Sequence, residues 1–461
     1  MAQNGSQDLG QGKVGKLLLQ LAIPAITAQL VNMLYNIVDR IYIGHIPGVG
    51  AAALTGVGVT MPVIILIMAF SSLVGMGGAP HASIQMGKGN DKGAEEILGN
   101  CFVLLVGVSV VLTACFLIFA RPLLMMFGAS EQTVPYALEY MNIYVSGTLF
   151  VQLSLGLNAF ITSQGFAKTG MLTVVIGAVI NILLDPLFIF VFDMGVSGAA
   201  WATILSQAVS CAWVMAFLLG KKTRLRLRCE NLRLRAKVLL PVLALGVSPF
   251  IMQSTESLLS IVLNTSLLKY GGDLAVGAMT ILASAMQILN LPMMGLAQGA
   301  QPIIGYNFGA GATDRVKKAF RLLFTCSVLY AAVFWAVIQL CPQVLVRLFG
   351  SDPQLIEFTV WAARIYFGAA VVLGVQISCQ QTFVSVGQAK SSLFLALLRK
   401  IILLIPLIYL LPCFFSDKVF AVFLAEPIAD FLAAASTFAL FMFQFNKILG
   451  KREKEIAEGR S

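Results

Sequence analysis

The sequence predicts an all-α polytopic membrane protein in which twelve transmembrane helices form two six-helix lobes related by a parallel internal repeat. Three observations lead to this prediction: an apolar composition, twelve apolar segments of spanning length, and one register that relates the two halves of the chain. Of the 461 residues, 58% are hydrophobic and only 11% are charged, whereas about 25% of the residues of a soluble globular domain are charged. This composition excludes an ordinary water-soluble domain.

The apolar segments have the length of membrane spans. A transmembrane helix needs about 20 predominantly apolar residues. Twelve segments meet this requirement, at approximately 17–42, 51–78, 94–119, 134–160, 169–192, 197–219, 238–268, 275–303, 318–341, 355–384, 391–412 and 419–446. The first is longer than the apolar region of a cleavable signal peptide, so we interpret it as a spanning helix.

Basic residues gather on one side of the predicted topology. An even number of spans places both termini on that side, together with the most basic segment. This segment contains Lys221, Lys222, Arg224, Arg226, Arg228, Arg233, Arg235 and Lys237. Because Lys and Arg are enriched in cytoplasmic loops, both termini are predicted to be cytoplasmic. Aromatic residues do not interleave with the basic ones, so the net charge of +10 does not indicate nucleic-acid binding.

The two halves of the chain match when the second is shifted by 222 residues. The matched pairs are Pro80 and Pro302, Gly87 and Gly309, Gly89 and Gly311, Phe127-Gly128 and Phe349-Gly350, Tyr144 and Tyr366, and Ala167-Lys168 and Ala389-Lys390. Six spans in each half give a parallel repeat with its axis along the membrane normal, an arrangement typical of transporters. We expect a first lobe at 1–219, a basic cytoplasmic linker at 220–237, a second lobe at 238–446 and a cytoplasmic tail at 447–461.

Two carboxylates lie within predicted spans of the first half, Asp39 and Asp185. A charged residue in the hydrocarbon costs at least about 2.5 kcal/mol, so it normally faces a cavity and has a partner. Asp185 follows Asn181 by four residues, which places both on one helix face, and Thr203 lies in the next span. Such an oxygen-lined pocket suits Na⁺, or a proton shared by two carboxylates that cannot both ionise cheaply. The alternative is that the carboxylates are helix-end or kink-stabilising groups.

The predicted spans of the second half contain both acidic and basic residues: Glu256, Arg399, Lys400, Glu426 and Asp430. An ion pair of Arg399 with Glu256 or with Glu426 is one interpretation, and a substrate-binding Glu256 is the other. Aromatic, amide and thioether side chains on spans near the proposed cavity are predicted to line it, namely Tyr35, Asn36, Gln253 and Met286.

The sequence offers no nucleotide-binding or metal-binding pattern. The Gly-rich stretches GKGNDKG and FGAGATD do not fit the phosphate loop GxxxxGK[ST]. The eight cysteines contain no CxxC pair, so neither a disulfide framework nor a cysteine metal site is expected. We therefore predict no cofactor, and an ion gradient as the source of energy.

Six motifs spread over nearly the whole chain resemble those of one transporter family: YNIVDRIYIG, GKGNDKGAEE, NILLDPLFIF, GAAWATILSQ, GYNFGAGATDRVKKAF and VGQAKSSLF. This is the multidrug and toxic compound extrusion family, in the branch of small-cation efflux pumps of Gram-positive bacteria. The resemblance implies twelve helices in two lobes and antiport of cationic compounds against H⁺ or Na⁺. It also implies a first-lobe cation site at Asp39, Asn181, Asp185 and Thr203, often joined by the backbone carbonyl of Ala199.

The second half departs from one pattern of this family. Members with a functional acid on the seventh span, where Glu256 stands, often have a second acid on the tenth span. This sequence has no acid there and offers Gln376, Gln380 and Gln381 instead. The sequence therefore does not predict a sodium site in the second lobe.

Together these features predict a secondary active multidrug exporter and not an enzyme. It would antiport organic cations such as drugs, dyes and biocides against H⁺ or Na⁺ by rocking of its two lobes. We expect a monomer in the bilayer of the bacterial cytoplasmic membrane, with a part in antibiotic resistance. One alternative is a flippase of the same superfamily for lipid-linked oligosaccharides or polyprenyl lipids, which needs a basic cavity and is kept open by Arg399 and Lys400. The other is a membrane-embedded binding or receptor protein.

Overall fold

The computed structural model describes residues 9–346 and 353–458, and this part of the chain consists of helices joined by turns and by the linker at 220–235, without a strand. Its α-helices are α1 (Val14–Gly44), α2 (Gly50–Gly87), α3 (Asp91–Ile118), α4 (Ala120–Met126), α5 (Val134–Ser146), α6 (Thr148–Ser163), α7 (Ala167–Pro186), α8 (Gly195–Leu219), α9 (Ala236–Gly309), α10 (Thr313–Leu340), α11 (Pro342–Val346), α12 (Pro353–Tyr366), α13 (Ala370–Ser385), α14 (Ala389–Leu397), α15 (Ile405–Phe414) and α16 (Lys418–Ala457). Two π-helical segments, η1 (Leu187–Val191) and η3 (Leu398–Leu404), and the 3-10 turn η2 (Cys229–Asn231) complete them.

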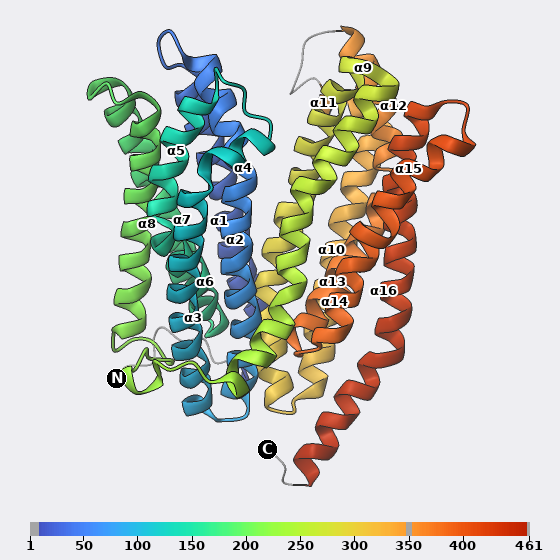
Figure 1. Ribbon diagram of the computed structural model, residues 1–461. Helices are drawn as coiled ribbons and strands as arrows, with labels where there is room; N and C mark the ends of the chain where they lie inside the picture. The colour runs from blue at the N-terminus through green and yellow to red at the C-terminus, as the bar shows by residue number, and fades with distance from the viewer. Residues whose placement is uncertain (1–8, 347–352, 459–461) are drawn as a thin grey trace.

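The helices confirm the prediction of twelve spans. Among the described residues, nine helices are long and apolar enough to cross a membrane, and the bent pairs α5–α6 and α12–α13 bring the number to eleven. Helix α9 is counted once although its 74 residues would extend about 110 Å, far more than a bilayer core of about 30 Å. At Gly272 its φ of 65° and ψ of −162° are not helical. The chain reverses there, so α9 supplies two spans (Figure 1).

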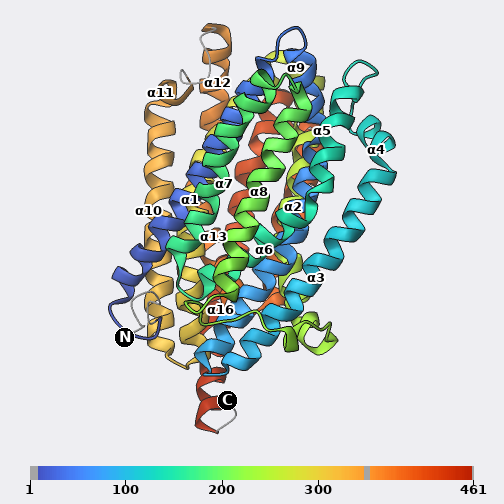
Figure 2. The same ribbon diagram turned by 90° about the vertical axis from the view of Figure 1, so that its left-hand side faces the viewer.

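The spans form two lobes, α1–α8 and α9–α16, which stand side by side in Figure 1. Viewed from the first lobe, the long helices run roughly parallel to one axis (Figure 2). The linker, the start of α1 and the end of α16 lie at the same end of the molecule, which we call the linker end. One core includes Leu17, Leu18 and Leu21 of α1 together with Ala300 and Leu323 of the second lobe. The first turns of α1 therefore pack against the second lobe.

The internal repeat is visible in the backbone. Gly89 and its counterpart Gly311 have φ values of 77° and 74°, and each lies in the turn after a long helix. Gly165 and Gly387, which the same shift relates, have φ values of 90° and 75°. Residues with a Cβ rarely adopt this left-handed conformation, so the glycines mark the same turns in both lobes. The predicted match at 349–350 lies outside the described residues.

The lobes approach each other most closely at the linker end. A Cβ on Gly77 of α2 would collide with the carbonyl oxygen of Val242 in α9, and a Cβ on Gly246 would collide with that of Leu73. Small residues let helix backbones come close within a membrane, where packing and not the hydrophobic effect holds helices together. This seam closes the linker end of the space between the lobes.

The helices extend beyond several predicted spans. Helix α2 continues to Gly87 and α16 continues to Ala457, so residues 447–457 of the predicted tail are helical. Residues 459–461 of that tail, like residues 1–8 of the predicted first lobe, lie outside the described part of the chain. Hydropathy alone ended these spans early because the helices continue past the apolar segment with polar residues.

Candidate functional site

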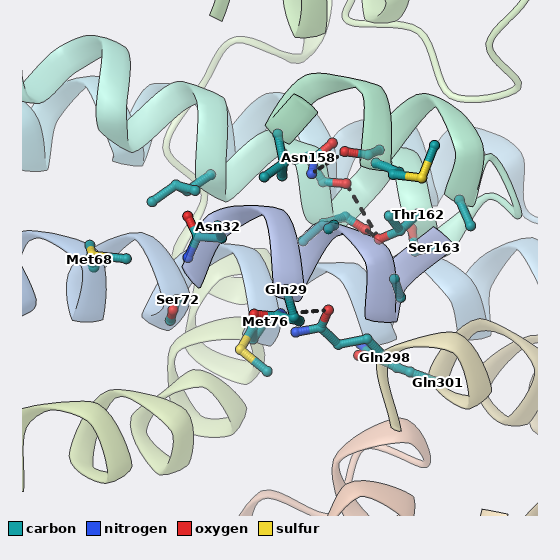
Figure 3. A pocket seen from close by; sticks show the side chains of 18 of the residues that line it. Gln29, Asn32, Met68, Ser72, Met76, Asn158, Thr162, Ser163, Gln298 and Gln301 are labelled. Carbon is teal, nitrogen blue, oxygen red and sulfur yellow. Dashed lines mark hydrogen bonds between the residues drawn. The ribbon is translucent and has the colours of Figure 1, made fainter. Parts of the chain in front are cut away.

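A cavity of about 290 Å³ lies where the two lobes meet. It is lined by residues of α1, α2, α5, α6, α7 and α8 from the first lobe and of α9 from the second. Every described residue that lines it is uncharged, and amides, hydroxyls and thioethers predominate among the polar side chains (Figure 3). A concave site with mixed apolar and hydrogen-bonding groups is typical of small-molecule binding.

Carboxamides cross the gap between the lobes at this cavity. Nε2 of Gln29 in α1 donates to Oε1 of Gln298 in α9 over 3.2 Å, a contact that Figure 3 shows. Nε2 of Gln253 in α9 donates to Oγ of Ser72 in α2 over 2.8 Å. These neutral hydrogen bonds must break when the lobes separate at this level, and each is worth about 0.5–1.5 kcal/mol.

The first-lobe residues predicted to bind a cation lie together on the outer side of this cavity. Nδ2 of Asn181 donates to Oδ1 of Asp185 over 3.2 Å and approaches Oγ1 of Thr203 at 3.4 Å. The Thr203 hydroxyl donates to the carbonyl oxygen of Ala199 over 3.0 Å. Asp39 approaches from α1, and its carboxyl group is within range of a hydrogen bond with that of Asp185. Helices α1, α7 and α8 thus bring five oxygen-bearing groups into one cluster.

Three oxygen atoms of this cluster lack a hydrogen-bond donor among the described residues: Oδ1 of Asp39, Oδ1 of Asn181 and Oδ2 of Asp185. Asp185 and Asn181 are almost completely buried. Buried polar atoms are normally satisfied, so a set of three unsatisfied acceptors requires an explanation. A proton between the carboxylates or a hard cation such as Na⁺ would satisfy them.

The local sequence explains how α7 presents these side chains. The spacing of four residues places Asn181 and Asp185 on the same face of α7. Pro186 cannot donate a hydrogen bond to the preceding turn, and the chain continues as the π-helical segment η1. Such wide turns occur frequently at functional sites because they redirect side chains.

The cluster is connected to the cavity through shared helices. Tyr35 of α1 lines the cavity, and Asp39 lies one turn farther from the linker end. Gln207 of α8 lines the cavity, and Thr203 lies one turn farther in the same direction. A ligand in the cavity and a cation in the cluster therefore act on the same two helices.

The second lobe contains a different cluster, composed of ion pairs. Nε of Arg399 lies 2.7 Å from Oδ1 of Asp430, and one of its terminal nitrogens lies 3.2 Å from Oε1 of Glu426. The ammonium group of Lys400 contacts the carboxylate of Glu256. It also donates to the carbonyl oxygen of Met252 over 2.8 Å.

These pairs decide between the two ion pairs considered for Arg399. The pair with Glu426 is present, whereas Glu256 contacts Lys400 in place of Arg399. Consecutive residues point about 100° apart in an α-helix and somewhat less in the wider π-helical segment η3, so Arg399 and Lys400 face different neighbours. Arg399 faces α16 and Lys400 faces α9.

Two of the four residues predicted to line the cavity do so, and the other two lie elsewhere. Tyr35 and Gln253 line it. Asn36 donates from Nδ2 to the backbone oxygen of Asn32 over 2.6 Å, and Met286 packs against the hydrophobic core of the second lobe. The sequence prediction did not include several polar residues that do line the cavity, namely Gln29, Asn32, Ser72, Asn158, Gln207, Gln298 and Gln301. Their signal in the sequence is an amide or hydroxyl within an otherwise apolar span.

Comparisons with known proteins agree with this architecture. The family model described as MatE matches residues 24–187 and 249–410. The multidrug export protein MepA of Staphylococcus haemolyticus is 23% identical over 93% of this chain and 94% of its own length. The FAD transporter of Shewanella oneidensis is 27% identical over 93% of this chain and 94% of its own length.

Solved structures have the same fold. A crystal structure of MATE in the bent conformation superposes with a TM-score of 0.90 at 23% identity, and the match covers 96% of this chain and 98% of that one. An outward-facing structure of a multidrug resistance MATE family transporter of the MOP superfamily gives a TM-score of 0.90 at 23% identity over 97% and 99% of the two chains.

Proposed function

Because this chain belongs to the MatE family, we propose that it is a secondary active exporter of organic cations that works by exchange against H⁺ or Na⁺. It is a multi-pass membrane transporter and not an enzyme. Transporters of this family need no cofactor. The coupling ion is the only ion that the proposal requires. The proposed place is the bacterial cell membrane, with both termini cytoplasmic and the protein acting as a monomer.

The observation that carries the proposal is the set of unsatisfied oxygens around Asp39 and Asp185. Two adjacent carboxylates that form no salt bridge with a described basic residue attract a cation strongly, and binding of one monovalent cation removes one of their two negative charges. A drug cation near the same carboxylates is attracted much less strongly when the coupling ion is bound. Mutually exclusive binding of the two cations would produce antiport.

Helix α1 can transmit this exchange between the lobes. Its first turns, with Leu17 and Leu21, pack in a core shared with the second lobe, whereas Asp39 belongs to the first-lobe cluster. Pro24 lies between these two parts, at a position where the helix lacks one backbone hydrogen bond and bends easily. A change of charge at Asp39 would therefore alter how α1 holds the two lobes together.

The arrangement of the lobes supports an outward-facing state. The seam formed by Gly77 and Gly246 lies at the linker end, which holds the basic residues expected in the cytoplasm. The cavity is then closed toward the cytoplasm, and rocking of the lobes about this seam would open it there. In this state the protein would release a drug and load the coupling ion from outside.

The cavity lining favours amphiphilic organic substrates. Met68, Met76 and Met171 adapt to different shapes, and the rings of Tyr35 and Tyr144 attract organic cations. The uncharged amides also admit a second candidate, a flavin nucleotide, which the FAD transporter of Shewanella oneidensis carries by its name. The flippase alternative needs a basic cavity, and Arg399 and Lys400 are already paired with carboxylates.

The test is uptake of ethidium into energised inside-out vesicles that contain the protein, measured with and without sodium. We expect the unmodified protein to move the dye and Asp39→Asn to reduce the rate to that of protein-free vesicles at equal expression. A sodium requirement would identify Na⁺ as the coupling ion, and dependence on the pH gradient alone would identify H⁺.

Three results would contradict the proposal in different ways. Transport of ethidium by Asp39→Asn at the full rate would mean that Asp39 is a structural helix-end group. Transport of FAD without transport of ethidium would favour the flavin nucleotide. Transport of neither compound would return the flippase to consideration.

A further inference from the structure

The ion pair between Glu256 and Lys400 joins an exposed carboxylate to a buried ammonium group. The side chain of Glu256 is 61% exposed, whereas that of Lys400 is 4% exposed. Gln253 lines the cavity, and Glu256 lies one turn farther along the same face of α9. Ser260, another turn on, is also exposed. A carboxylate in contact with lipid would be very costly, so we expect this polar stripe to face water between the lobes.

The second-lobe cluster also contains an acceptor that is not in use. Oε2 of Glu426 is buried and has no hydrogen-bond donor among the described residues. The charges of Glu426 and Lys400 lie close enough to act on each other. The cluster contains three carboxylates, Glu256, Glu426 and Asp430, against the two cations of Arg399 and Lys400. The cluster therefore has one carboxylate more than it has cations, and one further positive charge would balance it.

We propose that the ammonium group of Lys400 is a tethered competitor for the carboxylate of Glu256, and that it moves to Glu426 when the cationic group of a transported substrate takes its place. This inference rests on the proposed function, because it names where the second lobe holds the exported cation. Lys400 is then a specificity-determining residue: a weak cation cannot displace it from Glu256, whereas a strongly bound one can.

The exchange leaves no buried charge without a partner. An ammonium group has three donors, and Lys400 uses one for Glu256 and one for the carbonyl oxygen of Met252. When it moves, Oε2 of Glu426 gains the donor that it lacks. The substrate cation replaces Lys400 at the exposed carboxylate. Each step exchanges one charge-assisted contact for another, so the reaction can be reversible.

The first experiment measures equilibrium binding of tetraphenylphosphonium, a permanent cation, to the purified full-length protein in detergent. In Lys400→Met the competitor is gone while the buried stem remains, so the dissociation constant should fall about tenfold, the size of one charge-assisted hydrogen bond. Lys400→Arg keeps a competing charge and should bind much as the unmodified protein does. Lys269→Met removes the same charge from the outer end of the half of α9 that carries Glu256, and it serves as the matched control, without effect.

A double variant separates direct competition from a general change of electrostatic potential. If the gain in Lys400→Met acts through Glu256, then Glu256→Gln and the double variant with Lys400→Met should bind equally weakly. A gain that persists in the double variant would be a long-range field effect and would overturn the inference. Unchanged or weaker binding by a folded Lys400→Met would also overturn it, since it would make the pair purely structural.

The proposed destination of Lys400 has its own test. Glu426→Gln offers a poorer acceptor, so it should weaken binding of tetraphenylphosphonium several-fold when Lys400 is present. It should have no effect in the Lys400→Met background. Equal effects in both backgrounds would show that Lys400 does not move to Glu426. If no variant binds any cation and no cation is exported, the proposed function itself fails, a result distinct from each of these.

Discussion

The two lobes share one six-helix topology but treat their charged side chains differently. In the first lobe, Asp39 and Asp185 lie together and form no salt bridge with a basic residue among those described, although Arg40 is close enough to act on the charge of Asp39. Three oxygen atoms of their cluster lack a donor. In the second lobe, Arg399 and Lys400 supply the positive charge from within the chain. Within the described residues, the first-lobe cluster therefore has two carboxylates without an ion pair, whereas the second-lobe cluster has two cations for three carboxylates.

The repeat makes this difference visible position by position. At the shift of 222 residues, each residue of the first-lobe cluster corresponds to an apolar one: Asp39 to Ile261, Asn181 to Leu403, Asp185 to Leu407 and Thr203 to Ala425. Each charged residue of the second lobe likewise has a small or apolar counterpart: Glu256 has Leu34, Arg399 has Gly177, Lys400 has Ala178, Glu426 has Ile204 and Asp430 has Ala208. After duplication, each lobe therefore has a polar site that the other lacks. We infer that the first lobe couples transport to the ion gradient.

The largest effect is expected when the positive charge of Arg399 is removed from the second-lobe cluster. Arg399→Met leaves Glu426 and Asp430 buried without their counter-ion, and we expect the free energy of unfolding to fall by about 3–5 kcal/mol. Asp185→Asn keeps the shape of the first-lobe cluster and should change stability by less than about 1 kcal/mol while abolishing transport. Thermal unfolding in detergent measures both. Equal stability losses would mean that both clusters are structural.

A smaller effect is expected from a substitution of Thr203 in the first-lobe cluster. Thr203→Val removes a hydroxyl from the cluster but keeps the side-chain volume, so the apparent affinity for the coupling ion should fall about tenfold. Thr203→Ser retains the hydroxyl and should behave as the unmodified protein does. The measurement is the dependence of ethidium efflux on sodium concentration or on the pH gradient. Identical affinities for Thr203→Val and the unmodified protein would remove Thr203 from the site.

The weakest expected effect concerns the junction of the lobes at the linker end. Arg224 of the linker pairs with Asp91 of α3 at 2.8 Å, and its guanidinium lies 5.6 Å from the ring centre of Tyr306 in the second lobe. Because Arg224 is partly exposed, removing its side chain should destabilise the arrangement closed at the linker end by only about 0.5–1 kcal/mol. Arg224→Ala should shift the lobes two- to five-fold toward the inward-open arrangement, measured as distances between spin labels at the outer ends of the lobes. Arg224→Lys keeps the charge but loses the planar stacking, so an effect equal to that of Arg224→Ala would assign the contact to the ring.

The sequence predicted the features that depend on local spacing. The spans follow from apolar segments of sufficient length, and the clustering of Asn181 with Asp185 follows from a separation of four residues. The repeat predicted that both lobes would have the same turns, as Gly89 and Gly311 confirm.

The sequence did not predict contacts that depend on how distant helices pack. Nothing in the spacing selects Lys400 over Arg399 as the partner of Glu256, because both lie in the π-helical segment η3, whose turns are wider than those of an α-helix. The pair of Gln29 and Gln298 joins residues 269 positions apart, and each residue alone resembles an ordinary polar group in a span. Such pairs depend on the angle between the lobes.

The most direct test of the division between the lobes is ion release from the purified protein when ethidium is added. Proton release is followed with a pH indicator in weakly buffered detergent solution, and sodium release with radioactive sodium. We predict that the unmodified protein and Glu256→Gln, at saturating ethidium, release the coupling ion, and that Asp39→Asn releases none. Release by Asp39→Asn together with loss of release in Glu256→Gln would place the coupling site in the second lobe and contradict the account.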